Sequence, residues 1–483
     1  METMQPSLEQ VRQLRSLGNV IPVYKSVIAD FLTPVSAFLK LEKNQKYAFL
    51  LESVEGGETV GRYSFLGCGP FMLTRYNVGE PVPFVANLRS TMGRFKSVRI
   101  ADLPPFTGGA VGYFGYDMVR TIEDIPASGR NELGLDDAMM MFYKTVLAFD
   151  HLRHQIHIIS NLLIDESSDP IETQYEMAVA EISAIEALLR APLEWSESRA
   201  KHGEPEAHSN FEKAGYLRAI GKAKDYIAAG DIFQVVLSQR FDFDLPVPAF
   251  DVYRALRIVN PSPYMYFLKM PDASIVGSSP EMLVKVRGKE ALYRPIAGTR
   301  PRGADSAADD ALAEELKADE KERAEHIMLV DLGRNDLGRV CKYGSVRVED
   351  LMFIEKYSHV MHLVSSLKGE LRDDVDRWDA LMACFPAGTV SGAPKVRAME
   401  IIDEMEPTKR GVYAGAIMYV DFNNNLDSCI AIRTLVVRGS KAYIQAGGGI
   451  VADSNPESEY METVNKSRAL IRAIALAQNG FEL

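Results

Sequence analysis

Cysteine is scarce in this chain of 483 residues. Only four cysteines occur, and no two of them form a CxxC pair or a cysteine–histidine metal-binding spacing. In a chain of this length, such usage argues against a disulfide framework and indicates no cysteine-based metal site. The four are Cys68, Cys341, Cys384 and Cys429.

Long apolar runs and excess positive charge are also missing. No run of 18 apolar residues occurs, and the first residues have no apolar core of the signal-peptide type, so the expected location is the cytoplasm. The net charge is −12, which argues against nucleic acid or an anionic membrane as the main partner. An anionic substrate would therefore need local positive charge, from a divalent cation or a few arginines.

The common nucleotide-binding motifs are absent as well. No GxxxxGK[ST] sequence occurs, which disfavours a P-loop. The segment "GGAVGYFGY", 108–116, spaces its glycines as GxxGxxG and so does not match the dinucleotide-binding fingerprint.

The chain is too long for one ordinary hydrophobic core. A polar stretch with two prolines, 192–210, predicts a linker between an N-terminal region, 1–191, and a C-terminal region, 211–483. Strands occur in runs with helices between the groups, which predicts an α+β fold with antiparallel sheets. The clearest elements are a capped helix within 7–18, a hairpin around 151–154, a long helix over 308–332 and a last helix from about 456.

The start of the last predicted helix crowds carboxylates. In "SNPESEYMETVNK", Asn455 is a good N-cap and the proline after it a good first residue. Glu459 and Glu462 are three apart and share a helix face with Lys466. By itself, the motif favours a solvated surface helix with a Glu462–Lys466 ion pair.

A second Glu-x-x-Glu edge occurs in "DEKERAEHIMLVDLGRND", 319–336, where Glu322 and Glu325 precede an apolar run. If the two edges met, their carboxylates would repel one another unless a cation lay between them. Mg²⁺ suits such a site, because it takes one or two carboxylates directly and completes its shell with water and substrate oxygens. The alternative is two independent solvated faces.

The glycine run 447–449 precedes the last helix. Its backbone N–H groups have no side chains in front of them, and together with the helix N-terminus they offer an anion site. The alternative is an ordinary turn.

Six stretches, taken together, resemble the chorismate-utilising enzymes: "PSPYMYF" at 261–267, "GSSPEML" at 277–283, "RPIAGTRPRG" at 294–303, "EHIMLVDLGRND" at 325–336, "CFPAGTVSGAPK" at 384–395 and "GGGIVADSNPESEYMETVNK" at 447–466. The resemblance covers nearly the whole chain. It implies two large antiparallel β-sheets, packed face to face and flanked by helices. The N- and C-terminal regions would interleave in this fold, so 192–210 need not be a clean domain boundary.

The resemblance also implies an active site. Its Mg²⁺ site would use Glu325 and Glu462 as main ligands, with Glu322 and Glu459 as a second pair. The positions matching substrate contacts are Gly298, Thr299, Tyr413, Arg433, Gly447, Gly448, Gly449 and Lys466. His362 would transfer a proton in the elimination step, and Thr389 would orient a hydroxyl.

The implied reaction converts chorismate and ammonia to anthranilate and pyruvate, the first committed step of tryptophan biosynthesis. A glutaminase nucleophile is missing, since Cys68, in "LGCGP", lies between two predicted strands and not in a strand–turn–helix. We therefore expect a separate glutamine amidotransferase subunit, in a hetero-oligomer, to supply the ammonia.

Feedback inhibition by tryptophan is a further implication. The segments "LLES" and "NPSPYM" match an allosteric pocket, in which Ser53 would bond the amino acid and Pro263, Tyr264 and Met265 would line the indole site. The alternative is that both segments are strand ends packed in a core.

Two positions bear on the choice of nucleophile. Ala297 stands where aminodeoxychorismate synthases commonly have a lysine, and Gln234 where isochorismate and salicylate synthases have one. Without these amines, external ammonia is the expected nucleophile. The alternatives are one of those other family activities, or a non-catalytic tryptophan-binding subunit.

Overall fold

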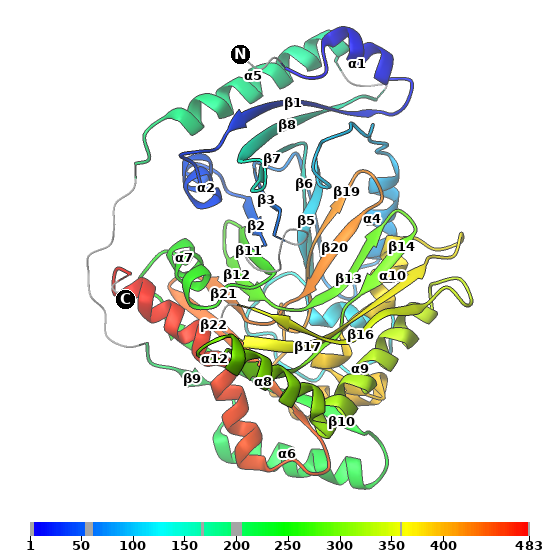
Figure 1. Cartoon of the computed structure of the whole chain (residues 1–483), viewed down its shortest axis with the longest axis vertical. Coiled ribbons are helices and arrows are strands. Elements are labelled where there is room, and N and C mark those ends of the chain that lie inside the picture. Colours follow the sequence, from blue (N-terminus) through cyan, green and yellow to red (C-terminus); the bar gives the residue numbers. More distant parts are fainter. Residues whose placement is uncertain (1–3, 54–60, 166–168, 195–204, 358–359, 482–483) are drawn as a thin grey trace.

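The computed structural model describes residues 4–53, 61–165, 169–194, 205–357 and 360–481. Its strands form two large antiparallel sheets that pack face to face, with helices on their outer faces (Figure 1). The predicted fold class is confirmed. None of the helices in these ranges is long and apolar enough to cross a membrane.

The first sheet, called sheet A, has twelve strands within the described ranges. In spatial order they are β1 (Val20–Ile28), β8 (Gln155–Leu163), β7 (Thr145–Asp150), β3 (Tyr63–Cys68), β2 (Ala48–Glu52), β11 (Tyr264–Lys269), β12 (Ser274–Ser279), β21 (Thr434–Arg438), β22 (Lys441–Ile450), β10 (Gln234–Asp244) and β18 (Gly392–Ala393). The short β9 (His208–Ser209) also pairs with β10. The predicted hairpin around 151–154 is the β7–β8 connection.

The second sheet, sheet B, has ten strands in the same ranges. In order they are β15 (Ile296–Pro301), β17 (Val360–Glu370), β14 (Glu290–Tyr293), β13 (Met282–Arg287), β20 (Leu426–Ile430), β19 (Ala416–Asp421), β5 (Gly109–Phe114), β6 (Ala138–Tyr143) and β4 (Met72–Tyr76), with β16 (Arg347–Lys356) paired to β17. The sequence pattern did not predict β16. Both sheets take strands from both sides of 192–210, so the two regions interleave.

The core between the sheets follows the two-residue period of strands. In β11, Tyr266 and Leu268 face sheet B, whereas Met265 and Phe267 face the helices outside sheet A. Phe267 packs edge-on against Phe250, with ring centroids 5.0 Å apart. Alternate residues of one strand therefore fill two different cores.

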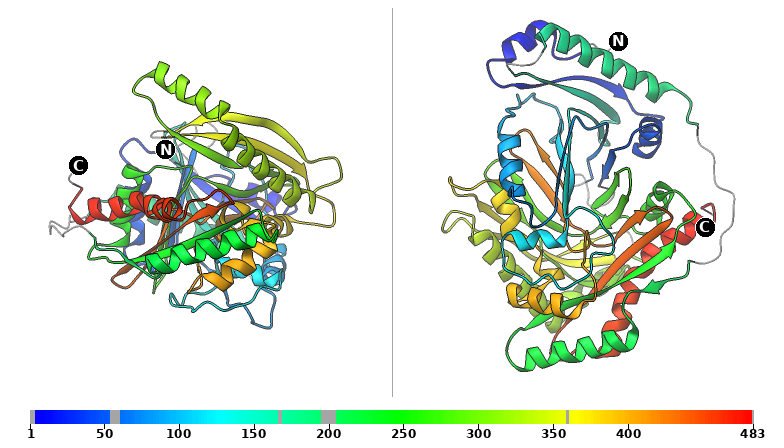
Figure 2. Two further views of the ribbon diagram at one scale, coloured as in Figure 1. Left: turned by 90° about the horizontal axis from the view of Figure 1, so that it is seen from below. Right: turned by 180° about the vertical axis from the view of Figure 1, so that it is seen from behind.

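Helices cover the outer faces (Figures 1 and 2). The helices α1 and α5 lie at one end of the molecule, beside β1 and β8, and α6 lies at the opposite end. Their bounds are α1 (Leu8–Leu14), α2 (Pro34–Glu42), α4 (Phe84–Gly93), α5 (Ile171–Arg190), α6 (Lys213–Ala228), α7 (Ala249–Val259), α8 (Ser306–Ala318), α9 (Glu320–Gly338), α10 (Arg377–Cys384), α11 (Lys395–Met405) and α12 (Pro456–Gln478), with short 3₁₀ turns at η1 (Tyr116–Thr121) and η2 (Gly388–Val390).

The prediction of one helix over 308–332 was wrong, because the chain forms α8 and α9 with a break at Asp319. The Asp319 carboxylate accepts hydrogen bonds from the backbone N–H groups of Lys321 and Glu322, which makes it the N-cap of α9. The last helix was predicted correctly: α12 begins at Pro456, and Asn455 caps it through the N–H of Ser458. Both Glu-x-x-Glu edges thus lie within the first two turns of capped helices.

A buried ion pair ties strand β10 of sheet A to the loops around it. Arg410 and Glu406 are almost fully buried and 2.6 Å apart. The Arg410 guanidinium also donates to the carbonyl oxygens of Val390 and Val236, each at 2.7 Å. It lies 5.5 Å from the ring centre of Tyr413. The Arg410 guanidinium therefore fixes the positions of η2, strand β10 and Tyr413 relative to one another.

Arg410→Met should destabilise the fold by about 3–5 kcal/mol, because it leaves the Glu406 carboxylate buried without its partner. Urea unfolding measures the loss. The control is Arg334→Met, which removes an exposed ion pair with Asp331 on α9 and should cost no more than about 0.5 kcal/mol. Equal losses in the two variants would contradict the role given to Arg410.

Candidate active site

The two Glu-x-x-Glu edges come together, one on α9 and one on α12. Loss of surrounding water, followed by the neighbouring charge of Glu322 and then that of Glu462, raises the pKa of Glu325, although part of the Glu325 side chain is exposed. Burial, and then the charge of Glu462, also raises the pKa of Glu459. Four carboxylates from two helices therefore share one electrostatic environment.

The glycine run lies in strand β22 and not in a turn. Helix α12 packs along this strand. A Cβ atom on Gly448 would lie 3.3 Å from Glu459 Oε2 and 3.9 Å from the Glu462 carboxyl carbon. The missing side chain lets the carboxylates of α12 rest against the strand.

Two amides of the glycine run point away from strand β10. Gly449 is paired with Val236, and Gly447 with Ser238. The N–H groups of Val236 and Ser238 donate to partners on the far side of β10, so these are non-hydrogen-bonded pairs. Strand β21 pairs with β22 only as far as Ile444. The N–H groups of Gly447 and Gly449 are thus directed to the side where no strand lies, as an anion site requires.

Basic groups stand beside these amides. Lys466 forms an ion pair with Glu462 at 2.6 Å and donates to the Gly447 carbonyl at 3.0 Å. Arg433 donates to the backbone carbonyl of Lys466 at 2.9 Å. Its backbone has φ 51°, an uncommon value for arginine. Burial raises the pKa of Tyr413 to about 12, so its hydroxyl remains a donor.

His362 lies at the other side of the site, on β17. Its Nδ1 is 2.9 Å from the Gly298 carbonyl oxygen and 3.1 Å from the Thr299 hydroxyl. Because a carbonyl only accepts, Nδ1 carries the proton and the neutral ring has its lone pair at Nε2. Gly298 has φ 64°, and a Cβ there would lie 3.1 Å from Glu322 Oε2, so this bulge in β15 joins His362 to the carboxylates.

The structure adds an acid that the sequence reasoning missed. Glu281, in the quoted "GSSPEML", is buried, and burial raises its pKa to about 7. It lies beside Thr389 and near Lys466, both of which favour its charged form and oppose this rise. The buried Thr389 hydroxyl forms no well-aligned hydrogen bond to it. The motif contains Glu281, but the burial that makes this carboxyl a proton donor arises from tertiary packing, which the motif does not reveal.

The two specificity positions lie beside the site. A Cβ on Gly449 would lie 2.5 Å from Gln234 Nε2, so the Gln234 amide faces the glycine strand. Ala297 is buried on β15, directly before Gly298, where a bulge interrupts the pairing with β17. Neither residue has an amine.

The carboxylate set suits a divalent cation that retains water. Glu459 Oε2 is a buried acceptor with no hydrogen-bond partner, and the repulsion described above favours a positive charge. Among the described residues, no three histidine, cysteine or acidic side chains gather closely enough to form a complete metal site. Mg²⁺, which needs only one or two protein carboxylates, fits this arrangement.

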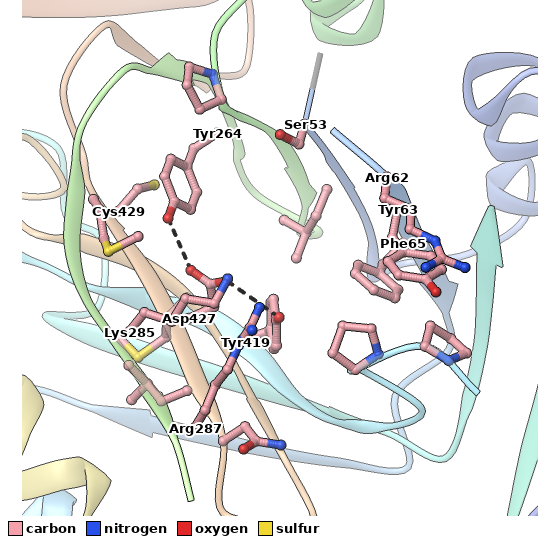
Figure 3. A pocket seen from close by; sticks show the side chains of 18 of the residues that line it. Ser53, Arg62, Tyr63, Phe65, Tyr264, Lys285, Arg287, Tyr419, Asp427 and Cys429 are labelled. Atoms are coloured by element: carbon pink, nitrogen blue, oxygen red, sulfur yellow. Dashed lines mark hydrogen bonds and ion pairs between the residues drawn. The ribbon is translucent and has the colours of Figure 1, made fainter. Parts of the chain in front are cut away.

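A separate cavity of about 950 Å³ lies between the sheets. Its lining includes all four residues of the predicted allosteric pocket: Ser53, Pro263, Tyr264 and Met265. In Figure 3, Tyr264 stands on one wall, with Tyr63 and Phe65 across from it. The Tyr264 hydroxyl donates to Asp427 at 3.2 Å. A cavity of this size and mixed lining accepts a small aromatic ligand.

Comparison with known proteins agrees with this geometry. The family model of the chorismate binding enzymes matches residues 46–472. The anthranilate synthase component 1 of Acetivibrio thermocellus is 49% identical over 97% of this chain and 98% of its own. The crystal structure of anthranilate synthase component I from Streptococcus pneumoniae has a TM-score of 0.78 and 37% identity, covering 92% of this chain and 99% of its own. The menaquinone-specific isochorismate synthase of Escherichia coli shares the fold, with a TM-score of 0.72 at 20% identity over 97% and 98%.

Glu459→Gln should stabilise the metal-free protein at pH 8 by about 0.5–1 kcal/mol, after allowance for solvent screening. Because folding raises the pKa of Glu459, ionisation of this carboxyl destabilises the wild type. The amide of the variant does not ionise and carries no such cost. The gain should therefore shrink as the pH falls toward 4.5, the ordinary value for glutamate. Thermal unfolding at several pH values measures it. Glu457→Gln, an exposed change on the same helix, should show no such trend.

Proposed function

The chain belongs to the family of chorismate binding enzymes, and we propose that it is the large subunit of an anthranilate synthase. The reaction combines chorismate with ammonia and forms anthranilate, pyruvate and water. One observation supports this choice of product. Acidic and anion-binding groups meet in the site, but Gln234 and Ala297 provide no amine.

Substrate binding requires two positive centres, because chorismate carries two carboxylates. At one end, the Arg433 guanidinium and the N–H groups of Gly447 and Gly449 receive one of them. At the other end, Glu325 and Glu462 would hold Mg²⁺, with Glu322 and Glu459 as the second pair. When bound, the ion neutralises the second carboxylate and anchors the ring. The acidic protein thereby accepts a dianion.

The amination step needs a proton donor for the leaving hydroxyl. Ammonia adds at C2 of the ring, the double bonds shift, and the 4-hydroxyl leaves as water. Glu281, with its pKa near 7, is protonated in a large fraction of molecules at neutral pH and supplies that proton. Thr389, beside it, orients the hydroxyl. The ammonium group formed at C2 then releases its extra proton to solvent, from which Glu281 is reprotonated.

The elimination step needs a base. Removal of the C2 proton restores the aromatic ring while the enolpyruvyl group leaves as pyruvate. Because Nδ1 of His362 is bound to the Gly298 carbonyl, Nε2 is the atom that accepts this proton. Thr299 holds the same ring, which keeps the lone pair in one direction.

The ammonia comes from a second subunit in this proposal. Cys341, Cys384 and Cys429 are buried, and burial raises the pKa of Cys68 to about 12. A glutaminase requires a reactive thiolate, which these environments oppose. The name "component 1" that the relatives carry also implies a partner component.

Feedback inhibition is the regulatory part of the proposal. Ser53, Pro263, Tyr264 and Met265 line the cavity between the sheets, where an indole ring has aromatic and apolar neighbours. Beside Ser53, Glu52 is buried and paired with Arg257 at 2.9 Å. That pair fixes the end of β2, from which Ser53 projects.

Incubation with chorismate, Mg²⁺ and ammonium at pH 8.5 should form anthranilate, followed by its fluorescence. Omitting ammonium should stop the reaction without releasing isochorismate, since Gln234 cannot activate water. A nonfluorescent aminated product would favour an aminodeoxychorismate synthase. Isochorismate or salicylate as the main product would overturn the choice of nucleophile, and unconsumed chorismate would favour a regulatory subunit.

The same assay tests the metal assignment. Glu325→Gln and Glu462→Gln should each abolish Mg²⁺-dependent turnover while the protein stays folded by circular dichroism. Glu457→Gln, on helix α12 but paired outward with Lys213, is the matched control and should keep wild-type turnover. Wild-type activity in either of the first two variants would remove that residue from the metal site.

Tryptophan should inhibit the wild type, and Ser53→Phe should weaken inhibition at least tenfold with little loss of uninhibited activity. A phenyl group at Ser53 would occupy the part of the cavity expected to hold the amino acid and leave the active site intact. The control is Ser183→Phe on the exposed face of α5, which should stay sensitive. If the wild type ignores millimolar tryptophan, the pocket assignment is wrong.

A further inference from the structure

The cavity between the sheets extends beyond the residues expected to bind tryptophan. Its lining also includes Arg294, Ile296, Glu355 and Tyr357, from the start of β15 and the end of β16. These residues lie on the part of sheet B that carries His362. One cavity therefore reaches from Ser53 to the neighbourhood of the catalytic histidine.

Tyr357 contacts both the cavity wall and the active-site histidine. Its hydroxyl donates to Glu355 Oε2 at 2.9 Å, and Arg294 donates to the same oxygen at 3.0 Å. Its ring meets the His362 ring edge-on, with centroids 5.5 Å apart and planes at 64°. The tyrosine thus bridges an ion pair in the cavity wall and the imidazole of the active site.

The backbone holds this bridge in place. Tyr357 is buried, its N–H donates to the Val360 carbonyl at 2.8 Å, and its own carbonyl accepts from Arg302. Arg302 is in turn paired with Asp309 of α8 at 2.6 Å. The ring therefore has little freedom to move without disturbing its neighbours.

Strand register gives a second, independent link. Glu355 is the cross-strand partner of His362 between β16 and β17, and Thr299 is its partner between β15 and β17. Directly paired residues project on the same face of a sheet. Thr299, His362 and Glu355 therefore form one row across three strands, with the substrate side at one end and the cavity at the other.

We propose that Tyr357 is a positioning residue for His362, and that through its bond to Glu355 it transmits ligand binding in the cavity to catalysis. The Gly298 carbonyl and the Thr299 hydroxyl hold Nδ1 of His362. The Tyr357 ring packs edge-on against the imidazole and so helps to keep Nε2 directed at the substrate. A ligand that alters the Arg294–Glu355 pair displaces the tyrosine ring and so misaligns the histidine. The transmission part rests on the proposed feedback function, whereas the positioning part does not.

The first test measures anthranilate formation without tryptophan. Tyr357→Leu removes the ring and should lower kcat about 10- to 100-fold, with the KM for chorismate within twofold, because misplacement of the base affects chemistry and not binding. Tyr357→Phe keeps the ring and should restore most of kcat. Tyr343→Leu, which changes a fully exposed tyrosine between α9 and β16, is the control. Unchanged kcat in a folded Tyr357→Leu, or an equal loss in Tyr357→Phe, would overturn the positioning role.

The second test measures tryptophan binding by calorimetry beside inhibition. Tyr357→Phe lacks the bond to Glu355 and should bind tryptophan with a Kd within threefold of wild type, yet keep at least half of its activity at saturation. Full inhibition at an unchanged Kd would overturn transmission through this bond. If the wild type does not bind tryptophan, the feedback proposal and the transmission part fail together, and the first test still decides the positioning role.

Discussion

Four carboxylates that meet from two helices, two of them resting against the glycine strand, are the constraint on which the site depends. Glu322 and Glu325 come from α9, and Glu459 and Glu462 from α12. Burial first, and then the charge of the neighbouring carboxylates, raises the pKa values of Glu325 and Glu459. An arrangement that costs free energy persists only when the surrounding fold stabilises it. The fold provides this through two capped helix starts, a run of three glycines in strand β22 and Lys466 as a counter-charge.

The supporting parts act on more than one site residue at a time. Arg410 contacts η2, strand β10 and the ring of Tyr413. It therefore fixes the position of the anion side of the site relative to η2, the turn that contains Thr389. On the other side of the site, Gly298 also acts on two residues. Its carbonyl orients His362, and its missing Cβ leaves room for Glu322. A few buried polar contacts thus set the distance between acid, base and anion site.

The sequence predicted the parts whose chemistry is local. Helix caps and the i, i+3 spacing of the glutamates depend on a few neighbouring residues, and α12 began where Asn455 indicated. The break at Asp319 was missed because a short polar residue within a helical pattern is usually a surface position of one continuous helix. Only the structure shows that the Asp319 side chain caps a second helix. Strand β16, with one partner and exposed residues, has too weak an alternation to predict. Glu281 was missed because its acidity comes from burial by distant segments.

The choice of nucleophile follows from what surrounds the glycine strand. A lysine at position 234 would place an ammonium group against Gly449, where the Gln234 amide now lies, and deprotonated it would activate water. A lysine at 297 would add a competing nucleophile beside Gly298. With an amide and a methyl group there, the site can orient a nucleophile but cannot generate one. Ammonia needs no activation once it is deprotonated, whereas water does, so in the proposed function the same pocket would leave water inert and remain reactive toward ammonia. Selectivity would then arise from the water-activating amine that position 234 lacks.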